Sequence, residues 1–519
     1  MDTDVISAAI DFGLQKLSFT EIKINQRKVV ESFLAGKDVF FCSPTGSGKS
    51  LTFEIAPFVF KYLQKNDMCI VLVISPLTSL MRTQTQALNR KGIKAVYLKD
   101  ITSPSNFEDS LTNLSLVDVK DGKIDIIFSS PESLIGHERK LLLDLAKKNF
   151  IKTVFVDEAH CIKKFGLPDK KKKKLAYRPC YGRLDEIRSL VGGHVPVVAL
   201  TATATEETKA VIKKQLCMDN CSEIMVNPDK KNVTYWVHNL PSDDICTNFR
   251  WLVKLLRGYK QATSRMIIFF RQIKHMADVY EYLETSLKHD AYIDFKEGGP
   301  NDNRNRLFDM FHMKTDDDVK DFICTSYMNP NGNIRVVLCS TSFSMGLDVK
   351  GVDTVIHYGP ANDVDDYVQE SGRAGREPSQ QCNAILLTYK RCLGSQNIFP
   401  SMKEYVKSQT CRRAFILNIF KTIVEHAHIP HFCCDICRLS CKWACSCEDE
   451  CVCTNTCNQV LPKINTAIMS NEDNDDSDDN DDNDITELDD MFSSDSGSDV
   501  LESSTRKPQV IYSSDDEMF

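Results

Sequence analysis

A glycine-rich turn between a strand and a helix constrains this chain more than any other stretch. Residues 39–42 form a short apolar run that predicts a buried strand, and the amphipathic residues 51–62 predict a helix. Between them the sequence reads Ser-Pro-Thr-Gly-Ser-Gly-Lys-Ser over residues 43–50. This matches the phosphate-loop pattern G-x-x-x-x-G-K-[ST], with Ser43 in place of the first glycine. We therefore expect a strand, a phosphate loop and a helix in this order.

The loop residues predict contacts with a bound nucleotide. Gly46 and Gly48 let backbone N–H groups converge on a phosphate without a Cβ in the way. Lys49 is expected to reach the β- and γ-phosphates and Ser50 to hold Mg²⁺, while the helix directs its positive dipole end at the same anion. The residues expected to bind ATP with Mg²⁺ here are Thr45, Gly46, Ser47, Gly48, Lys49 and Ser50.

Short β-branched runs alternate with helical stretches along most of the chain, which predicts an α/β fold with parallel sheets. The expected strands of a first lobe are 39–42, 70–74, 94–98, 124–128, 153–156 and 195–200, and those of a second are 266–270, 291–295, 334–339, 354–358 and 383–388. The predicted domains are a nucleotide-binding lobe at 1–230, a second lobe at 231–400, a helical Cys-rich subdomain at 401–460 and an acidic tail at 461–519.

Charge and cysteine are unevenly distributed. Residues 471–519 contain 18 acidic residues and two basic ones, Arg506 and Lys507, so their net charge is −16. Because the whole chain has a net charge of −8, residues 1–470 carry +8. The tail is expected to be disordered and open to protein partners, and the basic remainder permits a polyanion such as DNA. Nine of the 21 cysteines lie between Cys433 and Cys457, which favours metal binding over a disulfide framework. No signal peptide and no apolar run of roughly 18 residues is present, so we expect no membrane contact.

Two adjacent carboxylates follow the expected strand 153–156. Asp157 and Glu158 would lie at the carboxyl end of that strand, where open α/β sheets bind ligands. Asp157 is expected to hold Mg²⁺, and Glu158 to act as the general base for the attacking water.

The motif Asp157-Glu158-Ala159-His160, followed by Cys161, resembles the RecQ family of superfamily 2 DNA helicases. Other segments resemble family motifs in the family's order: Gln26, and residues 75–81, 130–134, 201–204, 344–348 and 367–376. The resemblance covers about residues 10–440. It implies two RecA-like lobes and an ATP-dependent 3′–5′ DNA helicase or translocase that unwinds duplexes in DNA repair or recombination. The expected location, the nucleus or else the cytoplasm, rests on the lack of a signal peptide and of a membrane-spanning run.

The resemblance also implies roles for single residues. Gln26 reads adenine, Gly346 and Asp348 contact the nucleotide, and Ser79 and Met81 contact single-stranded DNA. Arg373 and Arg376 are expected at the start of a helix on one face, from which they reach across the lobes to the phosphates. Such arginines stabilise transition-state charge when the lobes close.

The chain departs most from the family in the aromatic-rich loop after His160. Phe165 replaces the family's tryptophan, and Tyr177 and Arg178, displaced by an insertion, are expected to replace its Phe-Arg at the DNA. The insertion contains Lys170–Lys174, for which DNA phosphate contact, a solvated charge run and a nuclear localisation signal are all open. Two further segments, 22–25 and 310–315, match the family poorly.

The Cys-rich region resembles the zinc subdomain of the family. The expected Zn²⁺ ligands are Cys411, His431, Cys434 and Cys437, with Cys433 as a competing ligand. Six further cysteines from Cys441 to Cys457 suggest either a second metal site or a thiol-rich extension. We expect no winged-helix domain before the tail. The rival functions are an RNA helicase and a DNA-binding scaffold whose ATPase is uncoupled.

Overall fold

The computed structural model describes residues 3–102, 114–168, 175–242, 244–293, 303–329, 331–340, 349, 351–377, 380–395, 398–422 and 432–441. Several predicted features lie outside these ranges: Lys170–Lys174, Gly346, Asp348, His431, the cysteines after Cys441 and the acidic tail. Within the described part of the chain, no helix combines the length and apolarity that a bilayer crossing requires.

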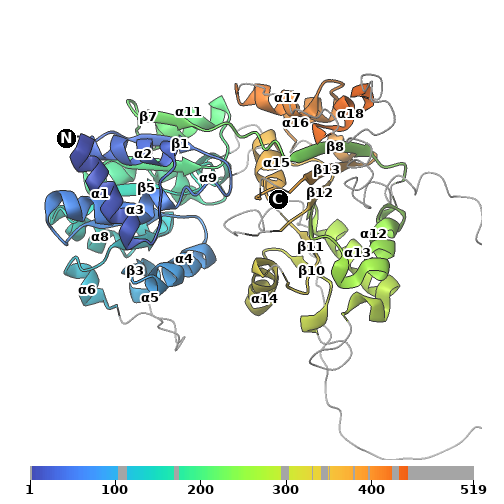
Figure 1. Ribbon diagram of the computed structural model, residues 1–519, viewed down its shortest axis with the longest axis horizontal. Helices are drawn as coiled ribbons and strands as arrows, with labels where there is room; N and C mark the ends of the chain where they lie inside the picture. Colours follow the sequence, from blue (N-terminus) through green and yellow to red (C-terminus); the bar gives the residue numbers. More distant parts are fainter. Residues whose placement is uncertain are drawn as a thin grey trace, which may run out of the picture.

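The first lobe is a parallel sheet of seven strands (Figure 1). Their order is β3 (Ala95–Tyr97), β4 (Ile126–Ser129), β2 (Ile70–Ile74), β5 (Ile151–Val156), β6 (Val197–Thr201), β1 (Val39–Cys42) and β7 (Ser222–Met225). The central strands are apolar on both faces, because helices cover both sides of a parallel sheet. Phe40 and Leu72 belong to one buried cluster, whereas Phe41 and Val71 belong to the cluster on the opposite face.

Helices cover the two faces of this sheet in separate groups. One buried cluster includes residues of α1 (Thr3–Lys16), α2 (Ile24–Leu34), α3 (Leu51–Gln64) and α4 (Thr78–Arg90). The opposite cluster includes residues of α5 (Leu98–Thr102), α6 (Leu116–Lys120), α7 (Pro131–Ile135), α8 (Arg139–Lys147), α9 (Cys161–Gly166), α10 (Glu186–Val191) and α11 (Glu206–Gln215).

The second lobe is a parallel sheet of six strands. Their order is β10 (Phe308–Phe311), β11 (Val336–Cys339), β9 (Met266–Phe270), β12 (Thr354–Tyr358), β13 (Cys382–Thr388) and β8 (Val233–Asn239). One face packs against α12 (Ile245–Tyr259) and α13 (Ile273–Leu287). The other packs against α14 (Asp317–Met328), α15 (Val364–Ser371), α16 (Pro400–Lys407) and α17 (Arg412–Ile419), with α18 (Asp435–Cys441) beside β8.

The predicted α/β class with two parallel-sheet lobes is confirmed. The strand expected at 291–295 is wrong in its described part, because Ala291 ends a 3₁₀ turn and Tyr292 makes only an isolated bridge to Arg306. Three strands were not predicted, namely β7, β8 and β10. The β10 strand runs directly into residues 312–315, so the poorly matching segment 310–315 begins at the carboxyl end of a strand.

Candidate nucleotide site between the two lobes

The phosphate loop connects β1 to α3 as the sequence predicted. Gly46 and Gly48 adopt φ angles of 78° and 85°, a left-handed conformation that strains a residue with a Cβ. Lys49 folds back over the loop, where its Nζ donates to the carbonyl oxygens of Ser43 at 2.7 Å and Pro44 at 3.3 Å. A phosphate can replace these carbonyl oxygens as the acceptor for the lysine, so the loop is shaped to receive an anion.

Gln26, near the start of α2, contacts the same loop. Its Nε2 donates to the carbonyl oxygen of Gly48 at 2.7 Å, and its Oε1 accepts from the N–H of Lys23 at 2.9 Å. A Cβ on Gly48 would lie 2.8 Å from Gln26 Nε2, so only glycine permits this approach. The predicted adenine reader thus lies against the phosphate loop, with its side-chain amide already hydrogen-bonded to it.

Asp157 and Glu158 follow the buried strand β5, two strands away from β1 in the sheet. Because all the strands are parallel, both carboxylates lie at the carboxyl ends of the strands, on the same side as the phosphate loop. Burial, with repulsion from Glu158 as the next cause, raises the pKa of Asp157 to about 7, while Lys49 opposes the rise. Burial likewise lowers the pKa of Lys49, and Glu158 and Asp157 counteract it. The loop lysine and the two carboxylates therefore form one electrostatic unit.

Glu158 has φ of 47°, an unfavourable conformation for a residue other than glycine, which costs about 1–3 kcal/mol. His160 lies beneath it, with Nδ1 3.3 Å from Glu158 Oε2 and 3.3 Å from Thr201 Oγ1. Burial lowers the pKa of His160, which keeps the ring neutral near pH 7. The histidine thus links the predicted base to Thr201 at the end of β6, the first residue of the segment 201–204 that resembles the coupling motif.

Arg373 and Arg376 belong to a segment that we call the arginine loop, residues 372–377. The prediction that they begin a helix is wrong, because α15 ends at Ser371 and both arginines follow it. The loop nevertheless contacts the phosphate loop of the first lobe. Thr45 Oγ1 donates to the carbonyl oxygen of Gly372 at 3.0 Å, and a Cβ on Gly46 would lie 3.8 Å from Arg376 Cγ. The structure therefore brings both arginines to the nucleotide-binding loop.

Four cations gather around this point. Burial is the main cause that lowers the pKa of Lys49, Arg373 and Arg376, the last to about 10, and it lowers the pKa of Lys230 to about 7. Sequence reasoning missed Lys230, because no motif marks it. Concentrated positive charge with restricted solvent access stabilises a polyanion. The arrangement thus suits the triphosphate of a nucleotide, with Ser50 and Asp157 placed to hold Mg²⁺.

A second contact between the lobes, which we call the clasp, joins α9 and α15. Lys164 Nζ lies 2.8 Å from Asp366 Oδ1, and their side chains are 25% and 9% exposed. Burial opposes the charge on Lys164, but Asp366 raises the pKa of this lysine overall. Asp365 accepts hydrogen bonds from Thr205 Oγ1 at 3.1 Å and Thr208 Oγ1 at 3.0 Å. The only sequence signal for the clasp is the group of aspartates just before residues 367–376.

The predicted DNA contacts have different surroundings. Met81 in α4 is fully buried in the core, which is incompatible with a side-chain contact to DNA in this conformation. Nothing is described of the Ser79 side chain. Phe165 and Tyr177 have ring centroids 5.7 Å apart, although an insertion separates them in sequence. Tyr177 is 54% exposed, and its hydroxyl lies 3.4 Å from Met313 Sδ of the second lobe.

Arg178 is engaged with protein groups. Its guanidinium donates to both carboxylate oxygens of Glu132, at 2.9 and 2.7 Å, and to the carbonyl oxygen of Pro76 at 2.5 Å. Such a two-point ion pair holds an arginine in a fixed orientation. Arg178 thus ties the divergent aromatic loop to the segments 75–81 and 130–134, and a phosphate would have to compete with Glu132 for it.

Within the described part of the C-terminal region, four thiols could hold a metal ion. The Sγ atoms of Cys411, Cys433, Cys434 and Cys437 all lie within 4.8 Å of one another. The Ala414 and Cys437 N–H groups lie 3.4 Å from the sulfurs of Cys411 and Cys434, as donors that stabilise thiolates. The donor set fits a tetrahedral Zn²⁺ site. The structure thus brings the three predicted cysteines together with the competing ligand Cys433.

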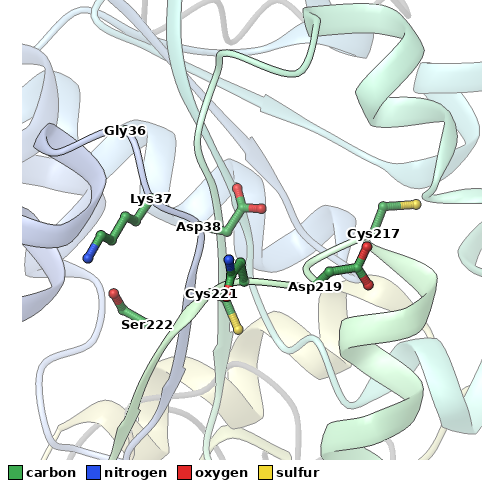
Figure 2. A pocket seen from close by; sticks show the side chains of 8 residues that line it. Gly36, Lys37, Asp38, Cys217, Asp219, Cys221 and Ser222 are labelled. Carbon is green, nitrogen blue, oxygen red and sulfur yellow. The ribbon is translucent and has the colours of Figure 1, made fainter.

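A separate depression of about 610 Å³ lies at the amino ends of strands β1 and β7, away from the carboxyl ends that carry the phosphate loop (Figure 2). It is lined by residues 36–38, before β1, and by residues around Cys217 and Cys221, before β7. Asp38 inside it is paired with Arg188 at 2.5 Å, and the two sulfurs point in different directions. The depression is therefore not the nucleotide site.

The two lobes match two helicase families. Residues 23–211 match the DEAD/DEAH box helicase family, and residues 247–377 match the helicase conserved C-terminal domain. The solved structure of the DUF1998 helicase MrfA bound to DNA superposes with a TM-score of 0.57 at 14% identity, over 80% of this chain and 54% of that one. Yeast Dbp5 bound to RNA and ADP BeF3 gives 0.52 at 15% identity, over 80% and 92%. At these identities the structures establish the fold alone.

Curated relatives cover most of this chain. The ATP-dependent DNA helicase RecQ of Pasteurella multocida is 26% identical over 83% of this chain and 62% of its own length. RecQ of Haemophilus influenzae is 27% identical over 81% and 62%, and a putative ATP-dependent RNA helicase of Acanthamoeba polyphaga mimivirus is 26% identical over 82% and 70%. The chain thus spans about 62% of the RecQ proteins that it matches. Residues 23–211 and 247–377 thus carry the two helicase domains in order on two parallel-sheet lobes, and the chain is similar to the RecQ helicases over most of its length.

Proposed function

We propose that this chain is an ATP-dependent DNA helicase or translocase that couples ATP hydrolysis to movement along single-stranded DNA. One observation supports it most. The groups that phosphoryl transfer requires come from both lobes and meet at one place: Lys49, Asp157 and Glu158 from the first, and the arginine loop from the second. Hydrolysis can then be coupled to the relative motion of the lobes.

Each residue has a defined task toward the nucleotide. Mg²⁺, when bound, would supply positive charge that offsets the charge of the triphosphate. Ser50 and Asp157 would hold that ion, and Lys49 would contact the β- and γ-phosphates. Glu158 orients the attacking water and accepts its proton, while His160 positions this carboxylate from below. Arg373 and Arg376 stabilise the charge that develops on the transferred phosphoryl group.

The finer parts of the proposal are those that the sequence led us to expect. They are 3′–5′ polarity, duplex unwinding in DNA repair or recombination, and a nuclear location. One Zn²⁺ at Cys411, Cys433, Cys434 and Cys437 would brace the second lobe, and the acidic tail is proposed to bind protein partners. Native mass spectrometry tests the metal: we expect one zinc per chain, and Cys434→Ser should lose it.

The central experiment measures ATPase activity and strand displacement on one preparation. We expect single-stranded DNA to stimulate hydrolysis, and duplexes with a 3′ overhang to be opened in preference to those with a 5′ overhang. Lys49→Ala should abolish both activities, because it removes the main cation at the phosphates. ATP hydrolysis retained by Lys49→Ala would refute the site assignment.

Two other functions are separated by the same assay. The mimivirus relative bears the name of a putative RNA helicase, so single-stranded RNA replaces DNA in a parallel reaction. Greater stimulation by RNA would favour that function. The pairing of Arg178 with Glu132 in the divergent aromatic loop favours a DNA-binding scaffold as the second candidate. Tight DNA binding without any stimulation of hydrolysis would support the scaffold.

A further inference from the structure

The segment that joins the two lobes runs directly along the arginine loop. Lys230 Nζ donates to the carbonyl oxygens of Gly372 at 2.6 Å and Ala374 at 3.0 Å, which flank Arg373 in the sequence. Two residues later, Asn232 Nδ2 lies within hydrogen-bonding distance of three more carbonyl oxygens, those of Gly375, Glu377 and Gln380. Two side chains of this segment thus hold the main chain on both sides of both arginines.

Attraction to nearby charges does not explain why Lys230 lies at this position. Its charged neighbours include Arg376, Arg373 and Lys49, and like charges disfavour one another. An ammonium group has three donors, and Lys230 directs two of them to main-chain carbonyl oxygens of the arginine loop. These hydrogen bonds fix the backbone that carries the arginines. The geometry therefore indicates a role in positioning this loop.

The joining segment is itself held from the other side by Arg413 of α17. This guanidinium pairs with the carboxylate of Asp229 and donates to the carbonyl oxygens of Lys230 at 2.8 Å and Val233 at 2.5 Å. Arg413 is 1% exposed, and it follows Cys411 of the thiol cluster by two residues. Lys230 therefore starts from a fixed backbone, so its two hydrogen bonds constrain the arginine loop rather than the joining segment.

We propose that Lys230 is a positioning residue for ATP hydrolysis: it holds the arginine loop so that Arg373 and Arg376 meet the phosphates when the lobes close. This inference rests on the proposed ATPase function. Because the arginines act mainly on the transition state, a displaced loop should lower kcat and leave ATP binding almost unchanged.

The test compares Lys230→Met, which keeps the length of the side chain but removes its donors, with Lys231→Met at the exposed neighbouring position. Lys230→Met should lower kcat by about tenfold or more, with KM for ATP within about twofold of the original value. Lys231→Met should change neither kcat nor KM for ATP, and Lys230→Arg should retain most of the activity. Lys230→Gln is the second variant if the methionine substitution yields no folded protein.

A cycle with Arg376→Ala shows whether Lys230 acts through the arginine loop. In that background Lys230→Met should cost no more than about twofold in kcat, because groups that act as one unit are not additive. An unchanged kcat in Lys230→Met, a raised KM alone, or full additivity would overturn the inference. If the unaltered protein hydrolyses no ATP, the proposed function fails; if it does and Lys230→Met equals it, only this inference fails.

Discussion

The main chain of Glu158 has an unfavourable conformation at the point where the proposed chemistry requires a base. Its φ is 47°, and its Oε2 atom lies 3.3 Å from His160 Nδ1 and is buried without a hydrogen-bond partner in the described part of the chain. We expect Glu158→Gln to lower kcat for ATP hydrolysis by about 10²–10⁴-fold, because an amide cannot accept the proton from water. Nucleotide binding, measured with a fluorescent ATP analogue, should remain. Glu223→Gln, in a surface ion pair of the same lobe, is the control, and an active Glu158→Gln would contradict the assignment.

The lowered pKa of Lys230 predicts how ATP hydrolysis depends on pH. Its pKa is lowered to about 7, chiefly by burial and then by Arg376, with Arg373 and Lys49 adding to the effect and Cys382 opposing it. The ammonium form therefore exists below pH 7 and is lost above it. If the charged form positions the arginine loop, kcat/KM for ATP should fall as the pH rises through about 7. Saturating Mg²⁺ keeps Asp157 ionised throughout. Lys230→Arg should remove the fall, because its guanidinium stays charged; an identical profile would contradict this role.

Helices α9 and α15 form the clasp between the lobes through Lys164 and Asp366. Removing one partner leaves the other charge poorly compensated, which costs about 1–3 kcal/mol and shifts the closing equilibrium by about 5- to 150-fold. We expect Lys164→Met and Asp366→Asn each to increase the radius of gyration in X-ray scattering and to lower ATPase activity. The control is Lys61→Met, which breaks the Lys61–Asp125 pair within the first lobe. Equal effects from all three variants would mean that the clasp has no special part in closure.

The strands that the sequence revealed are those buried on both faces. Val39–Cys42 and Met266–Phe270 are apolar throughout, so their composition alone indicates a buried strand. The strands β7 and β8 escaped prediction because both are edge strands with polar residues, such as Ser222 and His238. For Arg373 and Arg376, spacing indicated that they act together but could not indicate that a helix had just ended. The contacts of Lys230 depend on main-chain carbonyl oxygens, which no side-chain pattern encodes.

Taken as a whole, the molecule connects its thiol cluster to the nucleotide site through the edge of the second sheet. The edge strand β8 is covered by the Cys-rich region: Tyr235 N–H donates to the carbonyl oxygen of Cys433 at 3.3 Å, and Val237 N–H to Asp435 Oδ2 at 3.2 Å. The chain leading into β8 contains Lys230 and Asn232, which contact the arginine loop. In Figure 1, α17 and α18 lie above β8 at the top of the second lobe. The order of the Cys-rich region should therefore affect the order of this strand.

Hydrogen exchange after metal removal tests this connection. We expect a chelator to accelerate exchange at the Tyr235 and Val237 amides by about tenfold or more, because their acceptors belong to the region that the thiol cluster organises. Amides of β7, the edge strand of the first sheet, should not change, which makes them the internal control. Cys434→Ser should reproduce the effect without chelator. Unchanged protection at Tyr235 and Val237 after complete loss of zinc would show that packing alone holds the Cys-rich region on β8, and the metal would then have no part in ordering the nucleotide site.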